Sequence, residues 1–453
     1  MNRLVSFSIF LLVALVIPSA MATNGYFVYG YGTKNKGLSG AGVALPQDTI
    51  AAATNPAGMA HLGKRLDAGL ALFIPKREYE SSTSLANGAG GAFTVGPNDI
   101  ESDRKSFLVP HIGYNHPLGP QSSIGITSFA NGGMNTVWHG GTASFDPDGP
   151  GPGMTGTFPG TYGAGTTGVD LAQNFLALTY SRKVNERFSY GVGPVFGLQY
   201  VRVKGLSAFA GYTEDFVRSA GTVLPDDLTD KGRELSFGYG VKGGILWSPV
   251  PYLTLGGSYQ SRIYMSEFDD YASLLAEDGD FDVPPTMTLG LALRPDSDWT
   301  FVFDFQKIWY SKIDSLANPL SNLFDCPALG GTDPESCLGG DNGAGFGWND
   351  MEVYKLGVQY SVSPNLELRA GASFTEHPIQ RSEVLFNILA PATSEEHYTL
   401  GLTRKLPGER ELNFSVMYSP RDRQRGQSPF DPTQAVEVEM SQFELEASYS
   451  RRF

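Results

Sequence analysis

The feature that most constrains this chain is an alternation, with a period of two residues, between apolar side chains and polar or small ones. From 235 to 247 the odd positions hold Leu, Phe, Tyr, Val, Gly, Ile and Trp, whereas most even positions hold serine, glycine or lysine. From 443 to 449 the apolar residues again take the odd positions, and glutamate and serine take the even ones. Because successive side chains of a strand point to opposite faces, each such segment is predicted to be a β-strand with one apolar face.

Soluble sheets alternate too, so the connections between these segments decide the fold class. Short turns such as 184–186 and 407–409 alternate with long polar links rich in glycine and proline. An even number of strands of about ten residues, with short turns at one end and long loops at the other, is typical of outer-membrane barrels. The long links are 78–104, 139–169, 205–232, 267–283, 311–349, 377–395 and 421–440.

The predicted fold is therefore all-β, a 14-stranded antiparallel transmembrane β-barrel over residues 65–453. The sheet is expected to close on itself because lipid offers no hydrogen-bond partner to an open edge. The predicted strands are 65–77, 105–117, 122–138, 170–184, 187–204, 233–248, 251–266, 284–295, 298–310, 350–362, 365–376, 396–406, 410–420 and 441–453.

Residues 23–64 show neither strand alternation nor a long helical stripe. Seven glycines lie between Asn24 and Ala60, and glycine lets a backbone approach other elements closely. We predict that this segment is a hatch that plugs the barrel lumen. Within it, Asn55 and Pro56 are expected to cap a short helical turn.

Residues 1–22 have the form of a secretory signal peptide, with Arg3, an apolar run over 4–17 and a small-residue ending at Ala22. A membrane anchor is the alternative, but the run is shorter than the ~20 residues that span a bilayer. We expect an outer-membrane protein of a bacterium. Its predicted partners are the surrounding lipid and lipopolysaccharide, and the barrel-assembly machinery that would bind the last strand, which ends in Phe453.

Composition and motifs argue against several other functions. A net charge of −14 argues against a nucleic-acid partner, since binding phosphate requires clustered Lys and Arg. The stretch 238–243 matches the dinucleotide-binding fingerprint, but it lies in an alternating strand and opens no helix. No Gly-x-Ser-x-Gly, His-Glu-x-x-His or Walker-type loop occurs, so neither an enzyme nor a cofactor is expected. The six histidines are scattered, at 61, 111, 116, 139, 377 and 397.

Two features of the long links resemble structural or metal sites. Cys326 and Cys337 lie in one link and are expected to form a disulfide in an exported protein, with two free thiols as the alternative. The acidic run 277–282 has oxygen ligands for a divalent ion. However, Val283 replaces the glycine of an EF-hand and Leu289 its final acid, so a solvated acidic loop without metal is expected.

A series of short motifs points to a family. They are Asn55-Pro56-Ala57, Val109–His111, Gly125–Ser128, Trp299, Tyr354–Tyr360, Leu368–Gly371, His377–Ile379 and Tyr398–Gly401. In this order the chain resembles the FadL/TodX family of outer-membrane transporters for long-chain fatty acids and other hydrophobic compounds. The resemblance implies a fourteen-stranded barrel closed by a hatch, and passive uptake of molecules such as long-chain fatty acids. Aromatic or aliphatic hydrocarbons are the alternative substrates, and a structural or adhesive barrel is the alternative function.

The resemblance also implies a hydrophobic landing groove in the outer loops, for which packing within the loops is the alternative. Three cations, Lys242, Lys355 and Arg369, lie at the polar positions of their alternating strands and are therefore expected to face the lumen. There they would meet hatch acids such as Asp48 or a substrate carboxylate. The candidate substrate-binding residues are these three cations, Tyr26, Phe27, Phe209, Tyr212, Phe216, Tyr271, Leu274 and Leu275.

The last candidate site is an exit. Gly132 and Gly133 interrupt the alternation of the strand predicted over 122–138, as glycine does at bulges. The resemblance implies an inward kink there, with a lateral gap beside the Asn-Pro-Ala motif; a bulge that only adjusts barrel curvature is the alternative. The candidate gate residues are Asn55, Pro56, Ala57, Phe129, Asn131, Gly132 and Gly133.

Overall fold

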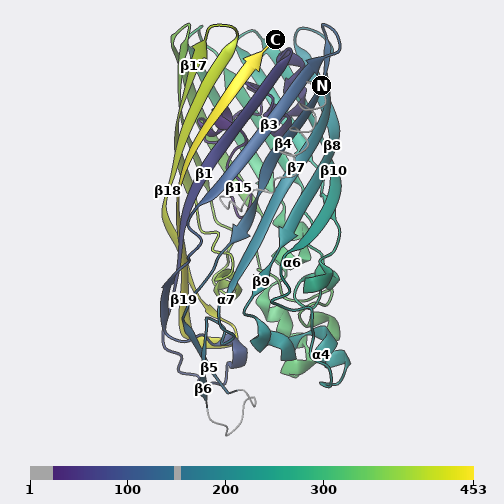
Figure 1. Cartoon of the computed structure of the whole chain (residues 1–453), viewed down its shortest axis with the longest axis vertical. Helices are drawn as coiled ribbons and strands as arrows, with labels where there is room; N and C mark the ends of the chain where they lie inside the picture. The colour runs from purple at the N-terminus through teal and green to yellow at the C-terminus, as the bar shows by residue number, and fades with distance from the viewer. Residues whose placement is uncertain (1–23, 147–154) are drawn as a thin grey trace, which may run out of the picture.

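The structure is a computed structural model that describes residues 24–146 and 155–453. The predicted signal peptide, residues 1–22, lies outside the described residues. Fourteen long strands form one closed antiparallel sheet (Figure 1). They are β1 (Arg65–Ser81), β3 (Phe107–Pro117), β4 (Ser122–Asn135), β7 (Gly168–Lys183), β8 (Phe188–Val201), β10 (Glu234–Val250), β11 (Leu253–Gln260), β13 (Thr286–Leu293), β14 (Trp299–Ile308), β15 (Met351–Ser363), β16 (Leu366–Thr375), β17 (Glu396–Leu406), β18 (Arg410–Ser428) and β19 (Asp431–Arg452).

The barrel closes between its first and last strands. β1 pairs with β3 on one side and with β19 on the other, from Arg65 opposite Arg452 to Ser81 opposite Val436. This confirms the predicted fourteen-stranded antiparallel barrel. Five short strands complete the sheets: β2 (Asn98–Glu101), β9 (Val203–Lys204) and β12 (Tyr264–Met265) extend the barrel, and β5 (Thr142–Phe145) pairs with β6 (Gly156–Pro159) in a separate hairpin.

The helices are all short. None in the described ranges is long and apolar enough to cross a membrane. The α-helices are α2 (Thr33–Lys36), α3 (Ala51–Thr54), α4 (Glu214–Arg218), α5 (Ala276–Gly279), α6 (Asp314–Ala317) and α7 (Val384–Asn387). The 3-10 helices are η1 (Pro56–His61), η2 (Gly91–Phe93), η3 (Ser207–Tyr212), η4 (Asp269–Tyr271), η5 (Tyr310–Lys312), η6 (Leu320–Asp325), η7 (Pro327–Leu329) and η8 (Pro334–Ser336).

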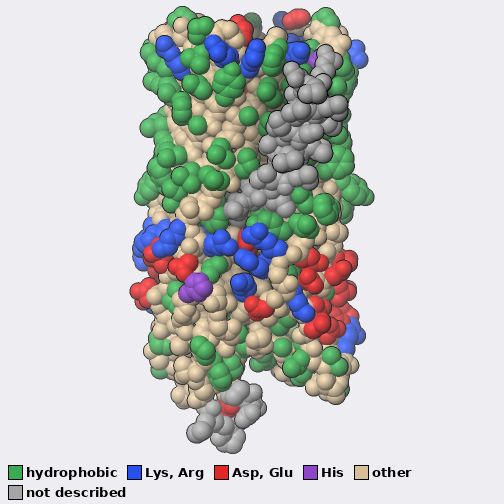
Figure 2. All heavy atoms as spheres, in the orientation of Figure 1, with side chains coloured by type: hydrophobic (Ala, Val, Ile, Leu, Met, Phe, Trp, Pro, Cys, Tyr) green, Lys and Arg blue, Asp and Glu red, His purple; other side chains and the backbone are tan. Residues whose placement is uncertain are grey.

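The alternation in the sequence becomes the two faces of the barrel wall. On β10 the outward residues Leu235, Phe237 and Tyr239 are 52%, 61% and 66% exposed, whereas the inward residues Ser236 and Lys242 are buried. Figure 2 shows hydrophobic side chains over the wall between two zones of charge, one at the upper rim and one below the middle. This apolar belt is the surface that lipid would cover.

One predicted loop is part of the wall instead. The link expected over 421–440 belongs to β18 and β19, which continue as a hairpin to a tight turn at 429–430. The sequence hides these strand ends because their outward face is charged, with Arg421 bonded to Glu439 at 2.9 Å. Residues 421–428 of β18 have no apolar face, whereas on β19 the buried residues Val436, Val438 and Met440 do alternate with charged ones.

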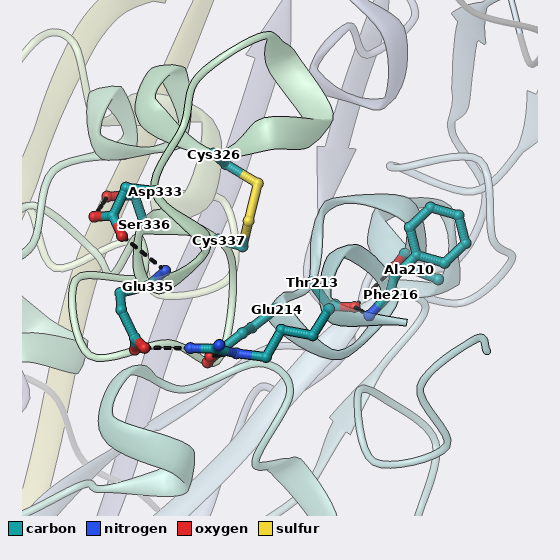
Figure 3. The surroundings of a disulfide bond; sticks show 10 residues. Ala210, Thr213, Glu214, Phe216, Cys326, Asp333, Glu335, Ser336 and Cys337 are labelled. Carbon is teal, nitrogen blue, oxygen red and sulfur yellow. Dashed lines mark hydrogen bonds and ion pairs between the residues drawn. A yellow bond between two sulfur atoms is a disulfide. The ribbon is translucent and has the colours of Figure 1, made fainter. Parts of the chain in front are cut away.

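The long loops pack together at the end of the barrel that is lower in Figure 1. Cys326 and Cys337 are buried and joined by a disulfide (Figure 3). Just beyond it, the amide of Leu338 donates to the carbonyl of Tyr212 at 3.0 Å, and the amide of Glu214 donates to Leu338 at 2.9 Å. The loop after β14 is thereby held against the loop after β8.

Residues 24–64 lie inside the barrel, and we call them the N-terminal segment. Nearly all of them are buried, and their polar groups bond to inward side chains from different parts of the wall. The amides of Gly42 and Val43 donate to Asp304 on β14 at 2.7 and 2.9 Å, and Thr33 donates to Glu446 on β19 at 2.7 Å. As predicted, the Asn55 side chain caps η1 by accepting from the Ala57 amide at 3.1 Å.

Candidate functional site

An apolar pocket lies where the loops meet the outer ends of the strands. Its volume is about 580 Å³, part of which is open to solvent. β4, β7, β8 and β9 contribute one wall and three loops the other. The lining is Met134, Val169, Leu171, Val201, Val203, Leu274, Leu275, Phe281, Ser315, Ala344, Gly345, Phe346, Phe386 and Leu389.

The pocket offers almost no polar contact. None of its described lining residues carries a charge. The one hydroxyl group, that of Ser315, donates to the carbonyl of Asp280 at 2.7 Å. Affinity for a ligand here would come from burial of apolar surface, at about 25 cal/mol per Å².

Beside the pocket the barrel wall is split. In the described residues the pairing of β3 with β4 ends at Ile112 and Ser128. Farther out, the one barrel strand of the described residues that pairs with β3 is β1, and the one that pairs with β4 is β7, across a register shift between Ala130 and Gly132. The two sides meet again where the Asp103 amide donates to the Val137 carbonyl at 3.0 Å. We call this opening, between residues 107–111 and 129–135, the window.

The N-terminal segment closes the window from inside. The amide of Val28 donates to the Asn131 carbonyl, and the amide of Gly133 donates to the Tyr26 carbonyl, both at 2.9 Å. A Cβ atom on Gly132 would lie 1.8 Å from the Tyr26 carbonyl oxygen, so only glycine permits this approach. A cavity of about 260 Å³ remains between the segment and both edges of the window, lined in part by Val28, Val109 and Phe129.

The pocket and the window are neighbours. Met134 lines the pocket and follows Gly132 and Gly133 on the same strand. From the other side, the Tyr26 ring lies 6.1 Å from that of Phe281, which lines the pocket, and 5.0 Å from that of Phe27. Tyr26 and Phe27 therefore separate the pocket from the opening in the wall.

One buried cation near the window is paired with no carboxylate of the described residues. The guanidinium group of Arg77, on β1, is buried, and its carbon lies 5.9 Å from the centre of the Phe107 ring. Both of its terminal nitrogens lack a hydrogen bond to the described residues. A buried charge is costly unless it is paired, so this group is available to an anion.

Buried ion pairs join the N-terminal segment to β18 and β19. Lys36 in the N-terminal segment lies 2.9 Å from Glu444 and 2.7 Å from Glu446, both on β19. Lys34 lies 2.5 Å from Glu411 on β18. Because each broken pair would leave a buried charge, this side of the segment resists displacement.

The predicted loop residues fall into three groups. Leu274 and Leu275 line the pocket. Phe209 and Tyr271 are buried in the hydrophobic core around it, and Tyr212 packs against that core. Phe216, on α4, belongs to neither the lining nor that core.

The three predicted lumen cations face inward but lie away from the pocket. Lys242 donates to the carbonyl of Ala53, and Lys355 donates to that of Tyr29 at 2.9 Å. Arg369 bonds to Gln47 at 2.8 Å and to Glu367 at 2.9 Å. The expected partner Asp48 bonds instead to the amide of Ile50 at 3.0 Å. All three cations hold the N-terminal segment or the wall, and none lines the pocket.

The Asn-Pro-Ala motif is not beside the window, and that expectation is corrected. Asn55 donates to the carbonyl of Ile245 on β10 at 2.9 Å, and the Ala57 carbonyl accepts from Ser181 on β7 at 2.9 Å. The window is contacted by Tyr26–Val28 instead. A capping motif specifies its own turn and says nothing of the wall it will face.

Sequence reasoning missed the wall of the pocket, which consists of Met134, Val169, Leu171, Val201 and Val203. The sequence did contain a sign of this pocket. Leu171 and Val201 are apolar, although they lie on the same inward face of their strands as the polar residues Gln173 and Gln199. Both glutamines are buried, and they bond to each other at 2.8 Å. Apolar residues on the lumen face of a barrel strand mark such a pocket.

The acidic run over 277–282 is only partly solvated. Asp280 and Asp282 are ion-paired with Arg262, the first at 2.8 Å. In the described ranges no group of three His, Cys, Asp or Glu side chains is placed to hold a metal ion.

Comparison with known proteins assigns the chain to a family. It matches the family described as outer membrane protein transport protein (OMPP1/FadL/TodX) over residues 14–424. No curated protein sequence matches it significantly. Its fold is similar to that of the toluene transporter TodX of Pseudomonas putida, with a TM-score of 0.63 and 15% identity over 94% of this chain and 99% of that one.

Two other solved structures are comparable. A FadL homologue of Pseudomonas aeruginosa has a TM-score of 0.63 and 16% identity over 95% of this chain and 100% of its own. The toluene transporter TbuX of Ralstonia pickettii has a TM-score of 0.60 and 14% identity over 94% and 99%. The family match confirms the predicted outer-membrane transport of hydrophobic compounds, and the family is one of transport proteins, not enzymes. The chain belongs to the OMPP1/FadL/TodX family of outer-membrane transport proteins.

Proposed function

We propose that this protein takes up small hydrophobic molecules through the pocket and releases them sideways into the membrane through the window. The observation that supports this route is the position of Met134, which lines the pocket and stands on the strand that bounds the window. Release requires only that Tyr26–Val28 withdraw from β4. Axial release would require the buried ion pairs of Lys34 and Lys36 to break.

Uncharged hydrocarbons are the substrates that the pocket favours. A carboxylate in it would meet no cation among the described lining residues and no free hydroxyl. Burying an unpaired ionised group costs several kcal/mol. Of the two substrate classes considered above, the neutral one therefore fits better.

Long-chain fatty acids are the second candidate, and Arg77 is the observation that favours them. Its unpaired guanidinium lies against Phe107, at the edge of the window. A carboxylate that reached the window could pair with it by two parallel hydrogen bonds. The acid would then be recognised at the exit and not in the pocket.

Uptake by cells that lack or carry the protein tests both candidates, with an alkane, a monoaromatic hydrocarbon and a long-chain fatty acid as ligands. Leu275→Gln places an amide in the pocket and should lower uptake of all three at least several-fold. Leu224→Gln is the control, because Leu224 is 66% exposed in another outer loop. Equal uptake with and without the protein, for every ligand, would contradict transport and favour a structural or adhesive barrel.

The C-terminal residue remains the proposed contact for the assembly machinery. Phe453 is 60% exposed, and its amide donates to the carbonyl of Lys64 at 3.0 Å. The end of the chain is thus fixed in position while its ring stays accessible. Removal of Phe453 is expected to reduce the amount of folded barrel in the membrane, and an unchanged amount would argue against this contact.

A further inference from the structure

Three arginines converge on one carboxylate on the outer face of the barrel wall. Arg233 and Arg202 donate to Asp170 Oδ2 at 2.9 and 3.2 Å, and a nitrogen of Arg104 lies 3.8 Å from the same oxygen. Asp170 is only 2% exposed, whereas the side chains of Arg104 and Arg233 are 40% and 52% exposed. A buried anion thus holds guanidinium groups at the surface.

The cluster carries an excess of positive charge. Asp170 Oδ1 is occupied by the hydroxyl of Tyr200 at 3.1 Å and by the amide of Asn135. Within the part of the chain that the structure describes, Arg104, Arg202 and Arg233 form ion pairs with no other carboxylate. Three cations share one anion, and most of their N–H donors are unused.

An arginine elsewhere on the wall shows what a neutralised exposed cation looks like. Arg421, on β18, also has a side chain that is 52% exposed, but it lies 2.9 Å from Glu439 and 3.6 Å from Glu78. Arg421 and Arg233 are therefore equally exposed, but only Arg233 belongs to a cluster with an excess of positive charge. This makes Arg421 a matched control for Arg233.

The cluster stands at the outer edge of the apolar belt. Arg233 immediately precedes β10, whose first outward residues, Leu235 and Phe237, are exposed to lipid. Figure 2 shows basic side chains gathered just below the apolar part of this face. In an outer membrane this level is occupied by the head groups of the outer leaflet.

We infer that Arg104, Arg202 and Arg233 bind a phosphate group of a phosphorylated glycolipid in the outer leaflet. A phosphomonoester carries a charge of about −1.5 to −2 at pH 7, which matches the excess of two positive charges. Guanidinium groups bind phosphate oxygens through paired hydrogen bonds. Lipid also supplies the apolar chains that the exposed apolar belt next to the cluster would contact.

The site would place a lipid beside the window. Asn135, which donates to Asp170, ends the same strand that carries Gly132 and Gly133. A bound glycolipid would therefore cover the wall on the β7 side of the opening. This site is separate from the apolar pocket, which lies on the inner face of the same strands.

The test uses the full-length protein in detergent with bisphosphorylated lipid A and measures its binding by native mass spectrometry. Arg104→Gln with Arg233→Gln should weaken binding at least roughly tenfold, since the change removes two guanidinium groups that would donate charged hydrogen bonds to the phosphate. Arg421→Gln should leave binding within about twofold, as expected for an exposed pair. The shift of the folded barrel on unheated gels confirms that each variant is folded.

Two results would overturn the inference. The first is equal binding of lipid A by the native protein and the folded double variant. The second is loss of the bound lipid when inorganic phosphate is added at concentrations comparable to those of the lipid, which would assign the site to a free anion. Dephosphorylated lipid A with the same acyl chains serves as the control for the phosphate groups. Its binding to the native protein should be no stronger than the binding of lipid A to the double variant.

Discussion

The amide nitrogen of Gly133 lies 2.9 Å from the carbonyl oxygen of Tyr26, although one residue belongs to the barrel wall and the other to the segment in the lumen. Together with the bond from Val28 to Asn131, this contact gives the free edge of β4 a substitute for the missing neighbour β3. A sheet edge at membrane depth must be satisfied within the protein. Residues 26–28 belong to the N-terminal segment, but they supply the hydrogen bonds that β4 lacks from β3. Their removal would therefore open the wall.

A substitution at Gly132 should disturb this closure. Because its Cβ would lie 1.8 Å from the Tyr26 oxygen, Gly132→Val is expected to displace residues 26–28 while the barrel stays folded. Hydrogen exchange should then become faster at the amides of Val28 and Gly133, and uptake of a neutral hydrocarbon should rise. Gly119→Ala is the control, since its Cβ would meet nothing within 4 Å. Unchanged exchange at both amides in the variant would show that the contact does not close the window.

Arg77 provides a test that separates function from stability. Arg77→Met removes a buried charge that has no partner among the described residues, so we expect the free energy of unfolding to stay the same or to rise. Arg65 is the matched control, because it is fully buried but bonds to Asp67 at 2.9 Å and to Glu411 at 2.8 Å. Arg65→Met removes the cation paired with Asp67 and one of the two cations paired with Glu411, which keeps Lys34, and should cost about 3–5 kcal/mol. Urea titration of the barrel in lipid vesicles measures both values.

The same Arg77→Met variant should distinguish the substrates. If fatty acids are recognised at the window, their uptake should fall while that of an alkane is unchanged. A parallel loss of both would show that Arg77 supports the wall in another way. A clear loss of stability in Arg77→Met would contradict the view that its charge is unpaired.

The barrel could be predicted from the sequence because each strand and each short turn is specified by neighbouring residues in the chain. The alternation from Leu235 to Trp247 reappears as exposed and buried side chains, and the short turns fall between the strands that they were expected to join. The ends of β18 and β19 were missed because Arg421 and Glu439 make their outward face polar. Residues 421–428 of β18 have no apolar face to recognise, but on β19 the alternation of Val436, Val438 and Met440 with glutamates was present in the sequence and was overlooked.

The closure of the window could not be predicted from the sequence. It depends on a contact between Phe27 and Gly132, which are far apart in the chain. The glycine pair correctly marked an irregularity in β4, but nothing in the sequence says which segment will face it. The Asn-Pro-Ala motif drew attention to the wrong part of the N-terminal segment for the same reason: its residues satisfy their own turn.

The anchoring of the N-terminal segment can be tested at Lys36. Lys36→Met leaves Glu444 and Glu446 buried without their cation, so it should cost about 3–5 kcal/mol of unfolding free energy and loosen residues 33–36 in hydrogen exchange. Adding Glu444→Gln and Glu446→Gln should restore most of the loss. Lys307→Met is the control, because it breaks an exposed pair with Glu352 and should cost at most about 1 kcal/mol. Full stability of Lys36→Met would mean that the segment is held by its backbone contacts alone.

Asp48 should make the stability of the native protein depend on pH. Burial, with the negative charge of Asp67 as the second cause, raises the pKa of the Asp48 carboxyl to about 6. A carboxyl whose pKa is higher in the folded than in the unfolded state destabilises the folded state when ionised. This destabilisation is present above pH 6 and disappears as the pH falls toward the unfolded value of about 3.9.

Asp48→Asn removes the ionisable group and keeps an oxygen that can accept from the Ile50 amide, as Asp48 does at 3.0 Å. The variant should match the native protein near pH 4 and exceed its unfolding free energy by up to about 3 kcal/mol near pH 8. Asp226→Asn is the control, because the Asp226 side chain is 95% exposed and its replacement should change little at either pH. An advantage of Asp48→Asn that was the same at pH 4 and pH 8 would show that the carboxylate at position 48 is not destabilised by its burial.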